Sequence, residues 1–140
     1  MRPHLVFEGV MKEMTFDFFG GDRHKIEMET LLSTRDAVFL DVRAKEEQDS
    51  VHIKLQHHIQ VMWIPIEEVP DRHDEIPRDV PVGVFCSSGT RSTIVYFYLR
   101  ALGYENVRIA PSSYDALTKM LLPGKLHKAI AARKAQEAKG

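Results

Sequence analysis

The stretch that decides the fold is Cys86-Ser87-Ser88-Gly89-Thr90-Arg91-Ser92, a polar loop that separates two apolar segments. Residues 80–85 before the loop form a short apolar run that is typical of a buried strand. Residues 93–102 after it carry apolar side chains at helical spacing. A strand, a tight loop and a helix are therefore expected to meet at the only cysteine of the chain.

The start of a helix is a favourable place for a negatively charged sulfur or a bound oxyanion. The first turn leaves amide N–H groups without intrahelical partners, and the helix dipole is positive at this end. A cysteine that faces those amides should ionise more readily, and the thiolate is the nucleophilic form. The loop also supplies the hydroxyls of Ser87, Ser88, Thr90 and Ser92, the flexible backbone of Gly89 and the cation of Arg91. We therefore interpret Cys86 as the candidate nucleophile.

The rest of the chain alternates apolar runs with helical segments. Further strands are expected at 37–42, 59–64 and 107–110. Helices are expected at 26–33, at 44–50, from Ser112 or Ser113 to Pro123, and at 126–138. At 140 residues, this alternation predicts a single α/β domain with a mainly parallel sheet.

Two expectations concern the surfaces that these elements bury. Residues 14–19 could form an extra edge strand that Gly20 and Gly21 close. The helix after the cysteine loop is expected to bury one face, which consists of Ile94, Phe97, Tyr98, Ala101 and Leu102.

Composition excludes several classes of protein. The net charge is −1, so no overall field recruits nucleic acid or an anionic membrane, although the segment from Lys125 onward is basic. That segment is interpreted as a solvated helix face, with docking of an acidic protein as the alternative. One cysteine allows no internal disulfide, and no apolar stretch of signal-peptide length opens the sequence, so a reducing, cytoplasmic setting is expected.

A metal site is not expected. His52, His57 and His58 lie close together in the sequence, but no companion cysteines or carboxylates stand at ligand spacing. Turn or solvent-facing histidines are the better interpretation.

Charged residues at a strand end carry more functional weight, because sites in parallel sheets lie beyond the carboxyl ends of the strands. Asp41 and Arg43 occupy such a position, where a purely structural role in bracing a loop is the alternative.

These motifs together resemble the rhodanese homology domain in its single-domain form. The resemblance covers about residues 26–124 and leaves an N-terminal extension at 1–21 and a basic C-terminal helix at 125–140. It implies a sheet of about five parallel strands with helices on both faces. It is carried by Val38-Phe39-Leu40-Asp41-Val42-Arg43, Glu47, His52-Ile53, the segment 84–92, Leu99 and Gly103-Tyr104.

The resemblance also implies a function, which is sulfur transfer through a cysteine persulfide. Cys86 would take sulfane sulfur from thiosulfate, polysulfide or a persulfide and pass it to a thiol or cyanide, with a sulfur-relay protein as a further candidate partner. Backbone amides of residues 87–92 would cradle the sulfur, Arg91 would hold the loop or steady donor charge, and Asp41 and Arg43 would brace the loop by ion pairs. This nucleophilic chemistry needs no metal or organic cofactor.

The sequence departs from the family pattern near the expected site. Ser112 and Ser113 replace paired glycines, Leu117 stands where an aromatic residue often follows, and Val51 replaces a small residue before His52. The spacing between residues 53 and 64 is also longer than in the family. These departures leave the donor and the shape of the pocket open.

Two other functions stay open at this point. A cysteine phosphatase or arsenate reductase also uses a cysteine loop that ends in arginine, but four residues separate Cys86 from Arg91, one fewer than in the phosphatase signature. The shorter loop suits a single sulfur atom better than a tetrahedral phosphate. A non-catalytic interaction or regulatory module is the second alternative, although the presence of a cysteine at the loop position argues against it.

Overall fold

A parallel β-sheet forms the centre of the computed structural model, which describes residues 3–55 and 59–139. Its strands lie in the order β2-β1-β3-β4, and every neighbouring pair is parallel. The strands are β1 (Val38–Asp41), β2 (Gln60–Trp63), β3 (Val82–Phe85) and β4 (Val107–Ile109). Within these described residues the sheet therefore has four strands, where the family resemblance implied about five. A single parallel bridge between Lys25 and Ile109 extends it beyond β4.

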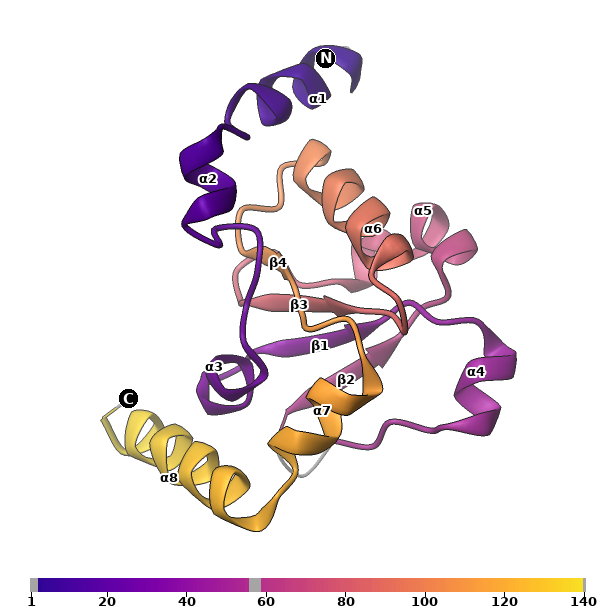
Figure 1. The fold of residues 1–140 in the computed structure, drawn as a ribbon. Coiled ribbons are helices and arrows are strands. Elements are labelled where there is room, and N and C mark those ends of the chain that lie inside the picture. The colour runs from indigo at the N-terminus through magenta and orange to yellow at the C-terminus, as the bar shows by residue number, and fades with distance from the viewer. Residues whose placement is uncertain (1–2, 56–58, 140) are drawn as a thin grey trace.

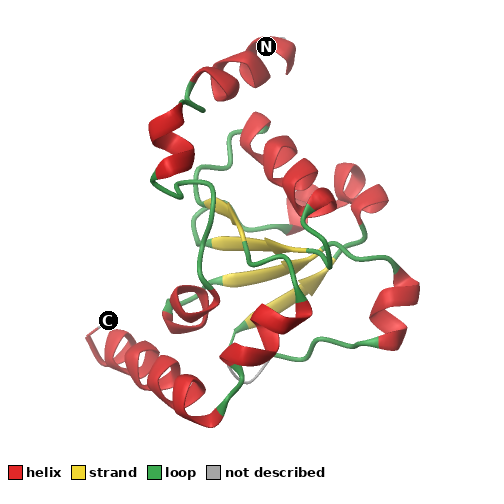
Figure 2. Cartoon of the chain, in the orientation of Figure 1, coloured by secondary structure: helices red, strands yellow, loops and turns green. Residues whose placement is uncertain are grey.

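Helices cover both faces of this sheet, as the family resemblance implied (Figures 1 and 2). The α-helices are α1 (Pro3–Lys12), α2 (Phe16–Gly20), α3 (Met28–Ser33), α4 (Lys45–Ser50), α5 (Val69–Arg72), α6 (Thr90–Ala101), α7 (Tyr114–Met120) and α8 (Pro123–Lys139). Two 3₁₀ turns, η1 (Ile66–Glu68) and η2 (His73–Glu75), flank α5.

Alternation of side chains along the strands creates two cores. Val38 and Leu40 of β1 pack in one cluster with residues of α5 and α6, whereas Phe39 packs in the other with residues of α3 and α7. Successive strand residues point to opposite faces, so a strand covered on both sides must be apolar throughout. This explains the apolar run from Ala37 to Leu40 that predicted β1, which ends at Asp41.

The helix after the cysteine loop buries a different face from the one expected. Its buried residues are Ser92, Val95, Tyr96 and Leu99, whereas Ile94 is 54% exposed. The helix begins at Thr90, inside the loop motif, and its sheet-facing side begins at Ser92 and continues at helical spacing through Val95, Tyr96 and Leu99. The predicted apolar face instead borders α1, where the rings of Phe7 and Phe97 lie 5.8 Å apart.

The two ends of the chain also differ from expectation. Residues 16–20 form helix α2 rather than a strand, because Thr15 caps it by accepting a hydrogen bond from the amide of Phe18. Pro123 begins helix α8 instead of ending α7, a position that suits proline because the first helical amide needs no partner. Helix α8 buries Ala129 in the core cluster that contains α3.

Candidate active site

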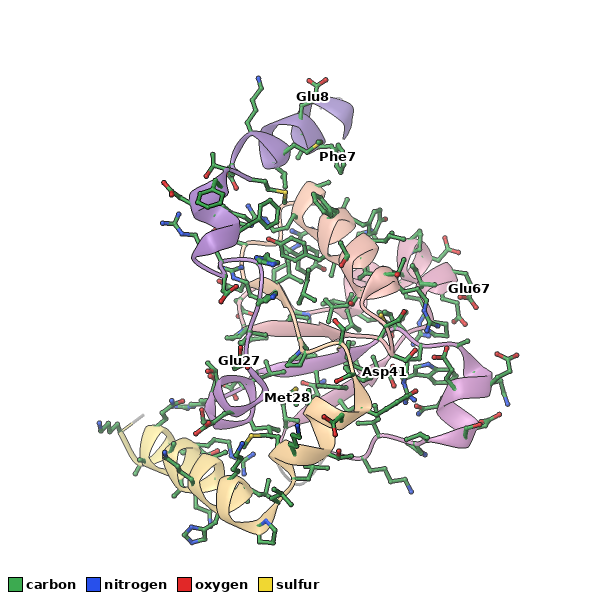
Figure 3. All side chains as sticks on the ribbon, viewed as in Figure 1. Phe7, Glu8, Glu27, Met28, Asp41 and Glu67 are labelled. Carbon is green, nitrogen blue, oxygen red and sulfur yellow. The ribbon has the colours of Figure 1, made fainter. Side chains whose placement is uncertain are left out.

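The cysteine loop and the Asp41 strand end lie side by side at the carboxyl edge of the sheet. Strands β1 and β3 are neighbours, and Asp41 is the register partner of Phe85, the residue before Cys86. Figure 3 labels Asp41 at this edge. The topology therefore brings together two motifs that stand more than forty residues apart in the sequence, at the edge where parallel sheets place their sites.

The sulfur of Cys86 is fully buried and surrounded by hydrogen-bond donors. The backbone amides of Gly89 and Ser92 lie 3.0 and 3.3 Å from Sγ. The Ser92 hydroxyl is 3.4 Å from Sγ and 3.1 Å from the Gly89 carbonyl, so it can accept from the thiol or donate to the thiolate. Gly89 has a φ of +92°, a left-handed conformation that glycine adopts freely, and this turns its amide toward the sulfur.

These contacts favour the ionised sulfur. Burial alone would raise the pKa of Cys86, but hydrogen bonds from the Ser92 hydroxyl and from the amides of Ser92, Ser88 and Gly89 outweigh it. The net result is a pKa below the ordinary value of a thiol. Such a shift is typical of a reactive cysteine and opposite to that of a structural cysteine in an apolar core.

Arg91 is held by Glu47 from helix α4. Both terminal nitrogens of the guanidinium donate to this carboxylate, and the Nη2–Oε2 distance is 2.9 Å. Ser87 joins the pair, since its Oγ lies 3.0 Å from Glu47 Oε2 and 3.1 Å from Arg91 Nη2. The guanidinium of Arg91 lowers the pKa of Glu47 to about 2. Burial opposes this shift, and hydrogen bonds from the Ala44 amide and from Ser87 add to it. Glu47 is therefore ionised at neutral pH.

Asp41 and Arg43 form a buried ion pair with each other. Arg43 Nε and Nη2 donate to the two carboxylate oxygens of Asp41 at 2.9 and 2.8 Å, and both side chains are at most 1% exposed. Residues two apart on an extended chain point the same way, which places these two side chains together. Direct ion pairs from Asp41 and Arg43 to the cysteine loop were expected, but this arrangement shows none among the described residues.

Arg43 instead ties helix α4 and its flanks to helix α7. It donates to the hydroxyl of Tyr114 and to Gln48 Oε1, both at 3.0 Å. It also donates to the carbonyls of Val51 and Glu47, at 2.8 and 3.3 Å. Its support of the cysteine loop is therefore indirect and passes through the backbone of Glu47.

Glu47 and Tyr114 are site residues that the sequence-based prediction did not single out. In the sequence, Glu47 stands out only as part of the family pattern. Its position directly after the Asp41 strand end was the available signal, because a helix that follows a central strand begins at the same edge of the sheet. Tyr114 follows the Ser113 cap, and nothing in its local sequence marks it.

The remaining predicted loop residues line the rim of the site. Ser88 and Thr90 are exposed, and Ser87 is half-buried. Ser112 reaches the loop from the segment after β4: a methyl group on Gly89 would lie only 3.0 Å from Ser112 Oγ. Ser113 caps α7 by accepting from the amide of Ala116 at 3.1 Å.

The other departures from the family pattern have separate places. Val51 is 47% exposed and uses its carbonyl to accept from Arg43, whereas Leu117 is buried in the core. His57 and His58 lie outside the described residues. Within 3–55 and 59–139, no group of three or more His, Cys, Asp or Glu side chains could hold a metal ion. Over the same residues, no helix is long and apolar enough to span a membrane.

Comparison with known proteins identifies similar domains. The family model described as "Rhodanese-like domain" matches residues 25–120. A tRNA sulfurtransferase from Yersinia enterocolitica is 32% identical over 85 residues, which are 60% of this chain and 17% of that protein. The chain thus spans about a sixth of the length of the curated relatives it matches.

Solved structures show the same similarity. The NAD-dependent persulfide reductase from A. fulgidus is 33% identical with a TM-score of 0.55, and the match covers 71% of this chain and 17% of that one. A rhodanese-related protein from Thermoplasma volcanium has a TM-score of 0.58 at 24% identity, with 71% and 95% of the two chains covered. The second similarity bears on the fold alone.

Proposed function

Because this chain belongs to the rhodanese-like domain family, whose model matches residues 25–120, we propose that it is a sulfurtransferase that carries sulfane sulfur as a persulfide of Cys86. Relatives named as sulfurtransferase and persulfide reductase support this chemistry. The observation that carries the proposal is the set of donors around Sγ, with the Gly89 amide at 3.0 Å and the Ser92 amide at 3.3 Å. Donors in these positions stabilise a thiolate, which is the form that attacks sulfur.

The reaction has two displacement steps. The Cys86 thiolate attacks the sulfane sulfur of thiosulfate, polysulfide or a persulfide and forms a new S–S bond. The old bond of the donor breaks, and its electron pair leaves with sulfite or with the donor thiolate. A thiol or cyanide then attacks the outer sulfur of the persulfide, and the electron pair of that bond returns to Cys86.

Two amides at the start of α6 are suited to hold the outer sulfur. The first residues of a helix have no intrahelical acceptor for their N–H groups. Ser92 directs its amide to Sγ, and the amide of Thr93 bonds to the Gly89 carbonyl at 3.1 Å. The described hydrogen bonds include no acceptor for the amides of Thr90 and Arg91, which leaves both for a bound sulfur anion.

The phosphatase alternative is weaker on two counts. The cysteine-to-arginine spacing is one residue short of the phosphatase signature. Both terminal nitrogens of Arg91 also donate hydrogen bonds to Glu47. Phosphatase chemistry instead requires a guanidinium that is free to bind the phosphate oxygens. A purely scaffolding role gives no reason for the lowered pKa of Cys86.

Intact-mass measurement after incubation with polysulfide or thiosulfate tests the proposal. We expect Cys86 to gain the mass of one sulfur atom and to lose it on addition of cyanide or a thiol, while Cys86→Ser gains nothing. Full sulfur transfer by Cys86→Ser would disprove the mechanism. Faster turnover of an aryl phosphate than of any sulfur donor would favour the phosphatase, and an unmodified Cys86 with every donor would favour the scaffold.

A further inference from the structure

The one charged residue of the Cys86 loop, which lies wholly within the described part of the chain, is paired with a carboxylate. Arg91 is the only charged side chain of residues 86–92. Its guanidinium forms a two-point ion pair with Glu47, and the two side chains are only 27% and 28% exposed. The pair is therefore shielded from solvent on most of its surface, and the positive charge of Arg91 is cancelled where it would otherwise face an incoming anion.

The second ion pair at this edge offers no free cation either. Arg43 is fully buried and paired with Asp41, and its other donors go to Tyr114, Gln48 and two carbonyl groups. The group of five ionisable side chains consists of the Cys86 thiolate and the two ion pairs, Arg91 with Glu47 and Arg43 with Asp41. Each pair is neutral, so the group has a net charge of −1. A donor with two negative charges approaches this group against greater repulsion than a donor with one.

We propose that Glu47 selects the sulfur donor by charge, because it neutralises Arg91 and so makes the loop favour singly charged or uncharged sulfane-sulfur compounds over dianions. This inference rests on the proposed sulfurtransferase function and names the donor class for it. Organic hydropersulfides belong to the favoured class, and thiosulfate belongs to the disfavoured one. Glu47 contacts no reacting atom, so it acts through Arg91 as a residue that determines specificity.

Two sulfur donors separate the effect of the donor's charge from the effect of its reactivity. Thiosulfate is a dianion, and methanethiosulfonate is its singly charged analogue in which a methyl group replaces one oxygen. Both place a sulfane sulfur on an oxidised sulfur atom, and Cys86 breaks the same kind of S–S bond in each. Sulfite leaves from the first and methanesulfinate from the second, each with the electron pair of that bond. The ratio of their kcat/KM values therefore reports how the site responds to one extra negative charge.

Glu47→Gln is the decisive variant. The glutamine retains an oxygen that can accept from the Ala44 amide, now 3.1 Å from Glu47 Oε1, but it releases the charge of Arg91. We expect kcat/KM for thiosulfate to rise about fivefold relative to methanethiosulfonate. This is the effect of one unit charge at roughly 7 Å from the extra charge of thiosulfate, at an effective dielectric constant of about 50. Added salt should reduce this gain, because screening weakens the attraction of the freed guanidinium.

Two control variants distinguish local charge from other effects. Glu46→Gln removes the same charge from the neighbouring exposed position of α4 and should leave the donor ratio within about twofold of the wild type. The double variant Glu47→Gln with Arg91→Gln restores the original net charge without the ion pair, and its ratio should return toward the wild-type value. A double variant that shifts as far as the single variant would overturn the proposal.

The remaining outcomes keep the two proposals distinct. If the wild type forms no persulfide with either probe, nor with a polysulfide or an organic hydropersulfide, the proposed function fails. If the wild type and Glu47→Gln both transfer sulfur with the same donor ratio, the sulfurtransferase function stands and the charge selection is wrong. If Glu47→Gln loses activity equally on both probes, or its gain does not depend on salt, Glu47 only supports the loop and the inference is overturned.

Discussion

Gly89→Ala is the substitution that most directly tests how the loop activates Cys86. Gly89 holds a left-handed φ of +92° and directs its amide to Sγ at 3.0 Å. An added methyl group would also lie 3.0 Å from Oγ and 3.1 Å from Cβ of Ser112. The alanine therefore meets two separate penalties, one from its own backbone and one from a neighbouring side chain.

The two penalties can be given magnitudes. A residue with a Cβ in the left-handed region costs about 1–2 kcal/mol, and a tight new contact in a packed site costs on the order of 1 kcal/mol or more. We expect Gly89→Ala to lower the free energy of unfolding by about 2–3 kcal/mol. If the loop relaxes instead, the Gly89 amide turns away from the sulfur. Loss of a hydrogen bond to a charged group costs about 1.5–3 kcal/mol, so the midpoint of the pH dependence of Cys86 alkylation should move upward by about one to two pH units.

Urea unfolding and the pH dependence of Cys86 alkylation measure the two effects. Ser112→Gly separates the penalties, because it removes the contact and leaves the backbone strain. In the double variant we expect about 1 kcal/mol of the lost stability to return. A Gly89→Ala protein with wild-type stability and a wild-type alkylation profile would refute this account of the loop, and a double variant no more stable than Gly89→Ala would refute the role given to Ser112.

Two further predictions concern the ion pairs. Asp41→Asn should lower the free energy of unfolding by about 3–5 kcal/mol, because it leaves the buried Arg43 guanidinium without a counter-charge; a loss below about 1 kcal/mol in urea unfolding would contradict this. Glu47 has a pKa of about 2 in the folded protein against an ordinary value of 4.5, so its ionisation adds at most about 3 kcal/mol of stability above pH 4.5, and this is lost as the pH falls toward 2. The stability difference between the wild type and Glu47→Gln should therefore shrink between about pH 5 and pH 2; a difference that does not change with pH would show that the Glu47–Arg91 charge interaction contributes nothing.

The sequence predicted the two central strands well because they are buried on both faces. The runs that became β1 and β3 are apolar except for Asp41 at the end of β1, a pattern typical of strands covered on both sides. The N-terminal aromatic residues were less informative. The aromatic residues at 16–19 suggested a strand, but Phe16 is 89% exposed and only Phe18 is buried. The segment is a helix, whose first turn is capped by the side chain of Thr15.

For the site, the sequence could predict the loop but not what holds it. Cys86 and its amides belong to one continuous segment, and the start of a helix fixes their relation through backbone geometry. The partner of Arg91 lies 44 residues earlier in the chain, and only the parallel pairing of β1 with β3 brings the two together. Such a contact depends on strand order, which local spacing does not contain. Asp41 and Arg43 were expected to brace the loop by ion pairs, but they lie two residues apart on one extended segment and pair with each other instead.

The pairing of charges also explains which groups activate the sulfur. An unpaired Arg91 would stabilise the Cys86 thiolate but would also attract any anion to the loop. Glu47 removes that attraction, so the thiolate must depend on the short hydrogen bonds from Gly89 and Ser92. Hydrogen bonds act over a few ångströms and stabilise only the acceptor atom that the donors contact. A free cation instead attracts anions over a Debye length of about 8–10 Å. An amide-based site can therefore stabilise a thiolate and its persulfide without binding small dianions tightly, and this would keep the cysteine available to donors of lower charge.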